Sequence, residues 1–524
     1  MREMVAKSVK LNRDLSKLLV ESVRTNSVVK IGWGRENDPK PRSGELGFCP
    51  FLPEKGRIRI LGDLANMTAA CAHGGTFVLE GTTGSLFGAW NRGASISSEG
   101  DCGSRAGLGM SGGRLVIRGS AGGEFAAGMS GGLAVVRGNG GRRAGAGMSG
   151  GIVVILGDAN TNVGCNMTGG MIVVNGRCPP PGEGAKAVPM DTKTLAEVNK
   201  SLEPVGWKVD PDAVVVISDE SQSTEISKPP SGIDSRFDGI TLVSSQGPRL
   251  SEHSPLDLLT LIQLKGEERG VLLPLPILPC VTSGKGLKGT MLTKQPCIVD
   301  SEPRSIDLMR ITAYNLPDIE TMLPNASGAV ICLDSFPPLD DAELDALNCI
   351  CRASLGDGKP MFLGGGIDRI DLVHRLAAAL DFDAAIAHSS TPAQLPAAAA
   401  LPMVGLSSRE HQLTRKGITS GLSLPWRVDA RDLLIASAAG SEFILANPFE
   451  GEEEPNTGKA RSEMLESWLA DLDSNIRGHL IELGEDGIDQ LNRKHLRALD
   501  SDTANMTGIR LAGYDRPMPQ WLGQ

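Results

Sequence analysis

The chain has 524 residues, including 65 Gly and 32 Pro, and a formal net charge of −10. At about 100–200 residues per domain, this length predicts two to four domains. The acidic balance gives no general electrostatic reason to bind nucleic acid or an anionic membrane surface, so neither is an expected partner.

Targeting and metal-binding motifs are not evident. The N-terminus lacks the apolar core of a signal peptide, and no run of about 18 apolar residues occurs, so we expect a soluble, cytoplasmic protein. The ten Cys include no CxxC pair and no close run of three, and the seven His include no HxH or HExxH. The spacing therefore predicts no metal site and no iron–sulfur cluster.

A repeat of 19 residues defines the first half of the chain. The segments MSGGRLVIRG, MSGGLAVVRG, MSGGIVVILG and MTGGMIVVNG begin at residues 110, 129, 148 and 167. Gly100, Gly81 and Gly62 extend the same phase backwards, so seven turns are visible from about residue 53 to 176. This period is too short for a helix–turn–helix repeat and lacks the pattern of leucine-rich repeats. It predicts a right-handed β-solenoid, or β-helix.

Two apolar columns run through these turns, two residues apart, as expected for one face of a strand. The first column contains Ile58, Phe77, Ile96, Leu115, Ala134, Val153 and Ile172. Met110, Met129, Met148 and Met167 also fall in register and are expected to stack inside the core rather than bind a metal.

The phrase GxGMSGG followed by VxVxG, repeated at this spacing, resembles the GXGXG β-helix domain over about residues 53–190. This domain occurs in the large subunit of glutamate synthase, in one of the subunits of formylmethanofuran dehydrogenase and in small glutamate-synthase-like proteins. The resemblance implies a structural and assembly role, and therefore partner subunits. The repeated glycine pairs are not followed by helices, so they do not predict phosphate loops.

The remaining chain divides at composition breaks. Residues 1–52 are a helical or extended lead-in, and residues 191–235 are predicted to form a cap and linker. From 236 to 515, apolar runs alternate with helical patterns, which predicts an α/β domain and, with seven or eight strands, a (β/α) barrel. The predicted strands are 240–245, 270–277, 296–301, 329–335, 360–366, 383–389 and 442–449, and the predicted helices are 340–355, 367–380 and 428–440.

A second resemblance lies near the C-terminus. Residues 420–449 and 479–513 are similar to the end of the FMN-binding barrel of glutamate synthase. The resemblance implies that Ser420 and Gly421 stand where the family's glycine pair holds the flavin phosphate. The family's three cluster-binding Cys and its GGTGASP-type loop have no counterpart, so we expect a degenerate barrel without an iron–sulfur cluster.

Other site candidates come from single positions. Gly364, Gly365 and Gly366 precede a predicted helix and could hold an FMN phosphate, although a plain strand-to-helix turn explains them equally well. His388 follows a predicted strand and is the candidate general acid or base, with a structural histidine as the alternative. The acidic stretch 450–458 is interpreted as a solvated insertion, although it lies where a barrel loop could approach a ligand.

Three functions are compatible with these features. The first is a non-autonomous subunit of a glutamate-synthase-like complex, in which the β-helix organises the assembly. The second is an active FMN-dependent oxidoreductase that reduces an imine formed from a 2-oxo acid and ammonia or an amine. The third is the β-helix subunit of a formyltransferase-type complex similar to formylmethanofuran dehydrogenase. Because the chain begins MREM, no N-terminal nucleophilic Cys is present, and ammonia is expected to come from another polypeptide.

Overall fold

The structure is a computed structural model that divides into two units. The first unit contains residues 1–227 and 339–354, and the second contains residues 228–338 and 355–524. The structure describes residues 3–32, 45–219, 237–244, 256–264, 270–366, 369–388, 397–424, 426–449 and 453–514. Among these residues, no helix is long and apolar enough to span a lipid bilayer.

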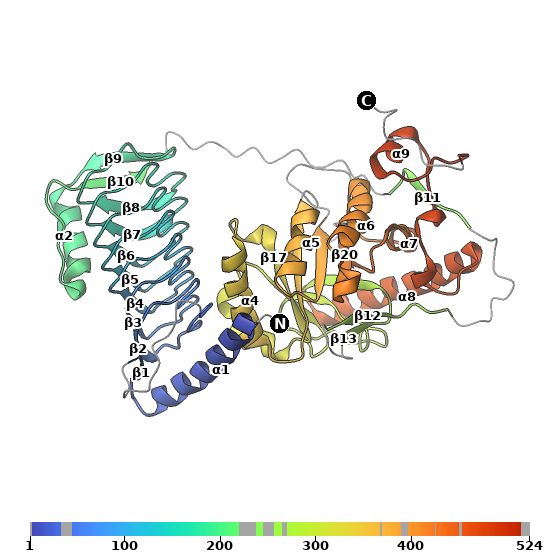
Figure 1. The fold of residues 1–524 in the computed structure, drawn as a ribbon, viewed down its shortest axis with the longest axis horizontal. Helices are drawn as coiled ribbons and strands as arrows, with labels where there is room; N and C mark the ends of the chain where they lie inside the picture. Colours follow the sequence, from blue (N-terminus) through green and yellow to red (C-terminus); the bar gives the residue numbers. More distant parts are fainter. Residues whose placement is uncertain are drawn as a thin grey trace. The chain divides into compact units, whose positions relative to one another are not determined.

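The first unit is built around one ten-stranded sheet, in which the first eight strands follow the chain order and the tenth lies between the eighth and the ninth (Figure 1). Its elements are α1 (Glu3–Arg24), β1 (Val29–Ile31), β2 (Arg57–Leu61), β3 (Thr76–Glu80), β4 (Ser95–Ser98), β5 (Arg114–Ile117), β6 (Leu133–Val136), β7 (Ser149–Ile155), β8 (Gly169–Val174), β9 (Ala185–Pro189), α2 (Thr192–Leu202), β10 (Val214–Ser218) and α4 (Asp341–Leu355). Strands β1 to β8 pair in parallel with their neighbours.

The 19-residue period appears directly in the strand register. Ile58 pairs with Phe77, and Phe77 pairs with Ile96, so each residue of the predicted first column lies beside its equivalent in the next turn. A second set of parallel bridges joins Leu64, Thr83, Cys102, Ala121, Gly140 and Ala159, again 19 residues apart. The predicted stacking of equivalent residues in successive turns is therefore confirmed.

The predicted methionine ladder lies in the core of this stack. Met110, Met129 and Met148 are fully buried in one cluster with the two apolar columns. The methyl carbon of Met110 lies 2.7 Å from the place where a Cβ at Gly132 would stand. Gly151 and Gly170 have the same relation to Met129 and Met148. The glycines thus make room for the thioether chains, which fill the interior as apolar side chains.

The last turn of the stack is closed by antiparallel pairing. Strand β10 pairs with both β8 and β9, although its residues fall within the segment predicted as cap and linker. Helix α2 begins after Asp191, whose carboxylate accepts hydrogen bonds from the backbone of Lys193 and Thr194. Val198 and Leu202 of this helix pack on apolar residues of β6, β7 and β8. Residues 191–219 therefore belong to the first unit and cover the end and outer face of its sheet.

Helix α4 belongs to the first unit, although in sequence it follows strand β17 (Gly328–Cys332) of the second unit. Its Glu343 is buried and forms an ion pair with Arg105 at 2.9 Å. Arg13 of α1 donates hydrogen bonds to the carbonyl oxygens of Arg352 and Ala353 at 2.8 and 3.1 Å. These charge-assisted contacts hold α4 against α1 and the stack of turns.

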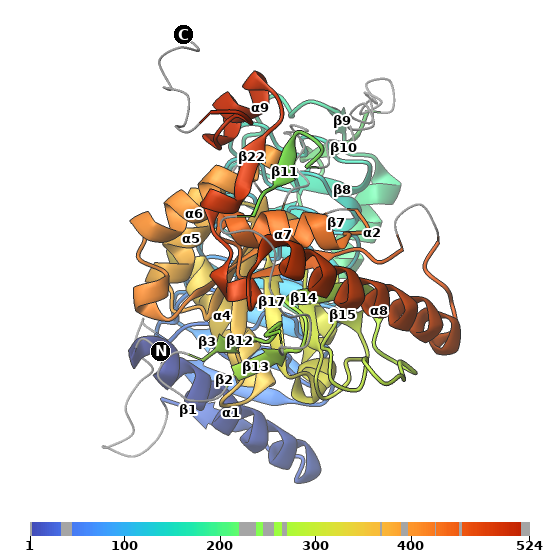
Figure 2. The same cartoon turned by 90° about the vertical axis from the view of Figure 1, so that its right-hand side faces the viewer.

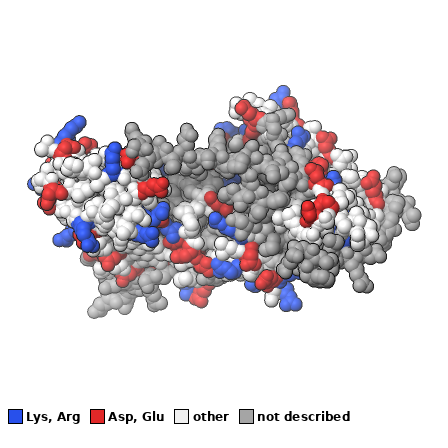
Figure 3. Space-filling view, turned by 90° about the horizontal axis from the view of Figure 1, so that it is seen from above, with Lys and Arg blue, Asp and Glu red and all other residues white. Residues whose placement is uncertain are grey.

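On the face of the first unit seen in Figure 3, basic and acidic side chains are interspersed.

The second unit contains a closed barrel of eight strands, β14 to β21, in chain order. The barrel elements are β14 (Ile277–Ser283), β15 (Ile298–Ser301), β16 (Leu308–Ile311), α3 (Ile319–Met322), β17 (Gly328–Cys332), β18 (Met361–Gly366), α5 (Ile370–Ala379), β19 (Ala384–His388), α6 (Ala400–Glu410), β20 (Thr419–Leu424), α7 (Ala430–Ala439), β21 (Phe443–Ala446) and α8 (Gly458–Leu483). All neighbouring strands are parallel, and β14 pairs with β21 to close the ring. The predicted (β/α) barrel is confirmed. Helices α5, α6 and α7 lie outside the strands, and α8 packs on α7 (Figure 2).

Several predicted strands take other places. The remaining elements are β11 (Ile240–Leu242), β12 (Thr260–Gln263), β13 (Gly270–Leu273), β22 (Leu496–Ala498) and α9 (Ser501–Thr507). Strand β11 pairs with β22 and lies outside the barrel. The predicted strand 270–277 is divided: β13 forms a hairpin with β12, and the first barrel strand begins only at Ile277. Ile262, Val271 and Leu273 of this hairpin pack against the barrel interior in one cluster.

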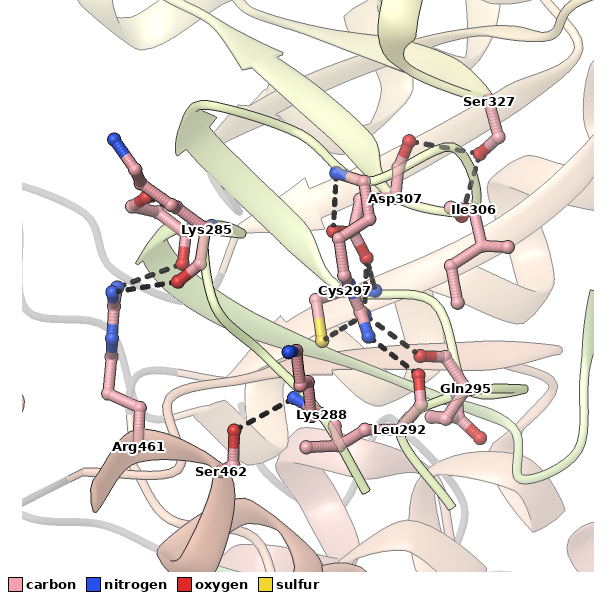
Figure 4. A network of polar contacts seen from close by, with 12 residues as sticks. Lys285, Lys288, Leu292, Gln295, Cys297, Ile306, Asp307, Ser327, Arg461 and Ser462 are labelled. Carbon is pink, nitrogen blue, oxygen red and sulfur yellow. Dashed lines mark hydrogen bonds and ion pairs between the residues drawn. The ribbon is translucent and has the colours of Figure 1, made fainter. Parts of the chain in front are cut away.

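A buried ion pair ties the starts of strands β15 and β16 together. The guanidinium of Arg304 donates to both carboxylate oxygens of Asp307, at 2.8 and 2.6 Å, and to the carbonyl oxygens of Leu292 and Gln295. The second carboxylate oxygen also accepts the backbone N–H of Cys297 at 3.0 Å (Figure 4). Asp307 has no solvent-exposed surface, so its carboxylate cannot hydrogen-bond to water. The hydrogen bonds from Arg304 and Cys297 take the place of those lost contacts with water.

Candidate functional site

A cavity of about 560 Å³ opens at the carboxyl ends of the barrel strands. Cys332 and His388 are the last residues of β17 and β19, and Asn447 directly follows β21. The lining residues are Cys280, Val281, Thr282, Ile298, Asp300, Arg310, Val330, Cys332, Asp334, Ser335, His388, Ser423, Leu424, Leu445, Asn447 and Glu454. The volume lies within the range of small-molecule sites, and this end of a (β/α) barrel is where catalytic residues gather.

Three potential ligand or proton-transfer groups meet in this cavity. The Nδ1 atom of His388 lies 3.3 Å from a carboxylate oxygen of Asp334 and 3.9 Å from the Sγ atom of Cys332. The three groups come from the ends of β17 and β19, which are separated by β18 in the barrel. His388, the predicted acid–base candidate, is therefore brought to the cavity together with two residues that the sequence analysis did not single out.

Burial and neighbouring charges act in opposite directions on these groups. Burial of the imidazole lowers the pKa of His388, but the contacts with Asp334 and Cys332 outweigh this and raise the pKa to about 9. Burial raises the pKa of Asp334, but the hydrogen bonds from His388 and from the N–H of Gly366 outweigh burial. The pKa of Asp334 therefore lies below its ordinary value. Both shifts favour the charged forms, so His388 and Asp334 form an ion pair at neutral pH.

The glycine run provides the space for this arrangement. Gly364, Gly365 and Gly366 form the buried second half of strand β18. A Cβ at Gly364 would lie 2.6 Å from Nε2 of His388, so the imidazole occupies the volume that a side chain would fill. The N–H of Gly366 donates to Asp334 at 3.1 Å. The run thus lies in the strand itself and supports the His388–Asp334 pair, while its assignment to an FMN phosphate stays a prediction.

A second ion pair faces the same cavity. Arg310 of β16 donates two parallel hydrogen bonds to Asp300 of β15, at 2.6 and 2.8 Å. The carboxylate raises the pKa of the guanidinium above its ordinary value, although burial opposes the shift. Cys280 lies beside this pair, and burial raises the pKa of its thiol to about 11. The pair places fixed charges of both signs on the cavity wall.

Glu454 closes one side of the cavity. Its carboxylate accepts hydrogen bonds from the backbone N–H and the hydroxyl of Thr282, at 3.0 and 2.8 Å, and lies 3.1 Å from Arg461. The interpretation of 450–458 as a solvated insertion is therefore wrong for Glu454, whose side chain is 18% exposed. Residues 450–452 lie outside the described residues. The sequence analysis did not single out Glu454 within this stretch, because Thr282, which donates two of these hydrogen bonds, lies 172 residues away in the chain.

Ser420 and Gly421 do not reach the cavity. Both lie in the first half of β20, whereas the cavity is lined by Ser423 and Leu424 at the end of that strand. Ser420 is buried, with its hydroxyl 3.3 Å from Nε2 of His374, and a Cβ at Gly421 would collide with the ring of Phe443. The predicted flavin role of this pair gains no support from its position, because barrel phosphate sites lie at the opposite strand ends.

His374 gives the barrel a testable pH dependence. Burial, followed by the nearby charge of His411, lowers its pKa from 6.5 to about 4, while Asp371 acts in the opposite direction. The unfolded chain therefore binds a proton first as the pH falls, and stability that is complete above pH 6.5 is lost down to about pH 4. A shift of this size corresponds to about 3 kcal/mol. Chemical denaturation at several pH values should show this loss in the wild type and a smaller loss in His374→Gln; equal pH slopes would contradict the assignment.

Comparisons with known proteins find similarity among solved structures alone. No protein-family model matches the chain, and no curated protein is significantly similar in sequence. Among solved structures, a flavocytochrome b2 double variant with sulfite bound is similar at a TM-score of 0.38 and 13% identity, covering 53% of this chain and 80% of that chain. The flavin-binding domain of baker's yeast flavocytochrome b2 is similar at 0.35 and 12%, covering 51% and 81%. A mandelate oxidase variant with an FMN adduct is similar at 0.36 and 11%, covering 49% and 88%. At these TM-scores no family is assigned to the chain.

Proposed function

We propose that the chain is the barrel subunit of a glutamate-synthase-like assembly, and that the barrel binds a small polar substrate in the cavity at its carboxyl end. The cavity is the observation that carries the proposal. It lies where barrel enzymes place their catalytic residues, and polar groups from several different strands and loops converge on it. The stack of 19-residue turns, interpreted as a β-helix, serves as the assembly element.

The charges of the cavity favour a substrate that carries groups of both signs. Asp300 and Arg310 present a carboxylate and a guanidinium side by side, and both are partly exposed. An ammonium on the ligand could contact Asp300 while a carboxylate on the same ligand contacts Arg310. Each ligand charge would then take over part of the interaction that the two side chains make with each other. An amino acid or its 2-imino precursor has this chemistry, which agrees with the glutamate-synthase resemblance.

A flavin phosphate fits the described cavity residues poorly. The lining cations Arg310 and His388 are both paired with carboxylates, and three carboxylates face two cations. The N–H groups of Gly366 and Thr282 already donate to Asp334 and Glu454. A dianionic phosphate would meet excess negative charge without an uncommitted donor among these groups. The FMN-dependent oxidoreductase is therefore the second candidate function.

Native purification of the tagged full chain with its partners tests the proposal. We expect a fixed stoichiometric complex with an amidotransferase or oxidoreductase subunit, identified by mass spectrometry. A chain that purifies alone at physiological concentration would contradict the assembly role, and a stoichiometric formyltransferase would favour the third function. Flavin absorbance near ~375 and ~450 nm with acid-released FMN would overturn the flavin-free cavity and favour the oxidoreductase.

Substrate binding can be measured on the isolated full chain. A thermal-shift series with amino acids and 2-oxo acids should show stabilisation by the amino acids, because a ligand that binds only the folded state raises the melting temperature with its concentration. Asp300→Asn keeps the shape of the side chain but removes its charge, and should weaken this stabilisation. Equal stabilisation of both proteins would exclude Asp300 as the ammonium partner.

A further inference from the structure

We propose that Cys332, Asp334 and His388 bind a single divalent metal ion, with Zn²⁺ as the preferred ion. Their ligand atoms, a sulfur, a carboxylate oxygen and a ring nitrogen, all lie within 4.8 Å of one another. In a tetrahedral site with bonds of about 2.0–2.3 Å, ligand atoms are about 3.3–3.8 Å apart. The distances of 3.3 Å and 3.9 Å from Nδ1 therefore need only small side-chain movements to accommodate the ion.

The direction of the contacts favours a metal over a catalytic triad. In a nucleophile–histidine–carboxylate triad, the two partners contact different nitrogens of the imidazole. Here the Sγ atom of Cys332 and the carboxylate of Asp334 both approach Nδ1, while Nε2 faces Gly364. A proton relay cannot run through one nitrogen in this way. Three donors that converge on one point instead describe the ligand shell of a cation.

The surroundings orient the ligands toward that point. The N–H of Gly366 donates to one oxygen of Asp334, and the other oxygen faces His388. Hydrogen bonds of this kind fix ligating carboxylates in metal sites. All three residues also line the cavity, so the fourth coordination position would face the space available to water or substrate. Three protein ligands with one open position are typical of catalytic zinc sites.

The ligand types select the metal. A thiolate ligand disfavours Mg²⁺ and Ca²⁺, which prefer oxygen, whereas Zn²⁺ accepts sulfur, imidazole and carboxylate ligands together. A bound Zn²⁺ would polarise a carbonyl or carboxylate oxygen of the substrate. The inference deepens the proposed function by placing a metal centre in its substrate cavity, but metal binding itself does not depend on the partner subunits.

Metal titration of the purified full chain tests the site without an activity assay. After removal of metals by a chelator, Zn²⁺ binding is measured by competition with a chromophoric chelator, and Co²⁺ is added to a second sample. We expect one equivalent of metal and a thiolate-to-Co²⁺ charge-transfer band. Cys332→Ser, Asp334→Asn and His388→Gln should each weaken binding by at least about 10–100-fold.

Matched controls separate the site from adventitious binding and from unfolding. Cys178→Ser and His479→Gln remove a thiol and an imidazole far from the cluster in sequence and should bind as the wild type. Circular dichroism and thermal unfolding establish that each variant is folded. Absence of binding up to millimolar Zn²⁺, or unchanged binding by folded Cys332→Ser, would overturn the metal site. The complex expected in native purification does not depend on that result, so the two proposals fail separately.

Discussion

Gly364→Ala is expected to weaken Zn²⁺ binding by about 10–100-fold, the range seen when the groups that orient metal ligands are disturbed. The new Cβ would lie 2.6 Å from Nε2 and 3.2 Å from Cε1 of His388. Backbone pairing on both sides holds β18 in place, so the imidazole must move. Its movement takes Nδ1 away from Cys332 and Asp334. The chelator competition assay measures the change directly.

Two other glycines provide controls for this variant. A Cβ at Gly365 would meet the side chain of Val373 at 2.7 Å, on the helix side of the same strand, so Gly365→Ala tests whether general disturbance of β18 is sufficient. A Cβ at Gly478 in helix α8 would meet nothing within 4 Å. Gly478→Ala should keep the wild-type affinity and add about 0.5–1 kcal/mol of stability. Wild-type affinity in Gly364→Ala would contradict the proposed position of His388.

Asp307→Ala is expected to lower the free energy of unfolding of the barrel by about 3–5 kcal/mol. The substitution leaves the guanidinium of Arg304 largely buried with its carboxylate partner removed, and also removes the acceptor for the N–H of Cys297. Urea unfolding, followed by the fluorescence of the Trp residues, measures the change. Because two units are present, the transition of the barrel has to be resolved from that of the turn stack.

A double variant that removes both charges tests whether the unpaired Arg304 causes this loss of stability. Replacing both partners by apolar residues, as in Arg304→Met with Asp307→Leu, removes the unpaired charge together with the pair. The double variant should therefore be more stable than Asp307→Ala. A loss below about 1 kcal/mol in Asp307→Ala, or an even less stable double variant, would show that the buried pair is not what holds the starts of β15 and β16 together.

The stack of 19-residue turns could be predicted from the sequence because the same contacts recur every 19 residues along the chain. Each residue of the first column, such as Ile58 or Phe77, has its equivalent 19 positions later as its neighbour, so the period alone specifies the register. The closing strand β10 was not predicted as part of the sheet, because it pairs antiparallel and lies outside the repeat. Periodicity carries no information about such a pairing.

The barrel strands were harder to recognise individually. β16 has only four residues, and β20 reads TSGLSL, with small and polar residues where buried parallel strands usually have branched apolar ones. Strand β20 was not among the predicted strands, and the resemblance assigned a flavin phosphate site to its pair Ser420–Gly421. Its burial is explained by contacts with His374 and Phe443, which lie in other elements and cannot be inferred from local sequence.

The candidate site was found in part because strand ends carry its polar residues. His388 was singled out as a polar residue that ends a predicted strand. The same rule, applied to AVICLDS and PCIVDS, would have indicated Cys332, Asp334 and Asp300. Motif spacing indicated no metal site because Cys332 and His388 are 56 residues apart and meet only when the barrel closes. Ligands from different strands leave no local motif.

X-ray absorption at the zinc K-edge, on the full chain loaded with one equivalent of Zn²⁺, tests the central claim most directly. The proposed centre predicts one sulfur at about 2.3 Å and nitrogen or oxygen ligands at about 2.0–2.2 Å, with the outer scattering of one imidazole. Loss of the sulfur contribution in Cys332→Ser would assign it to this cavity. A shell of nitrogen and oxygen alone in the wild type, or a sulfur that persists in Cys332→Ser, would contradict the account.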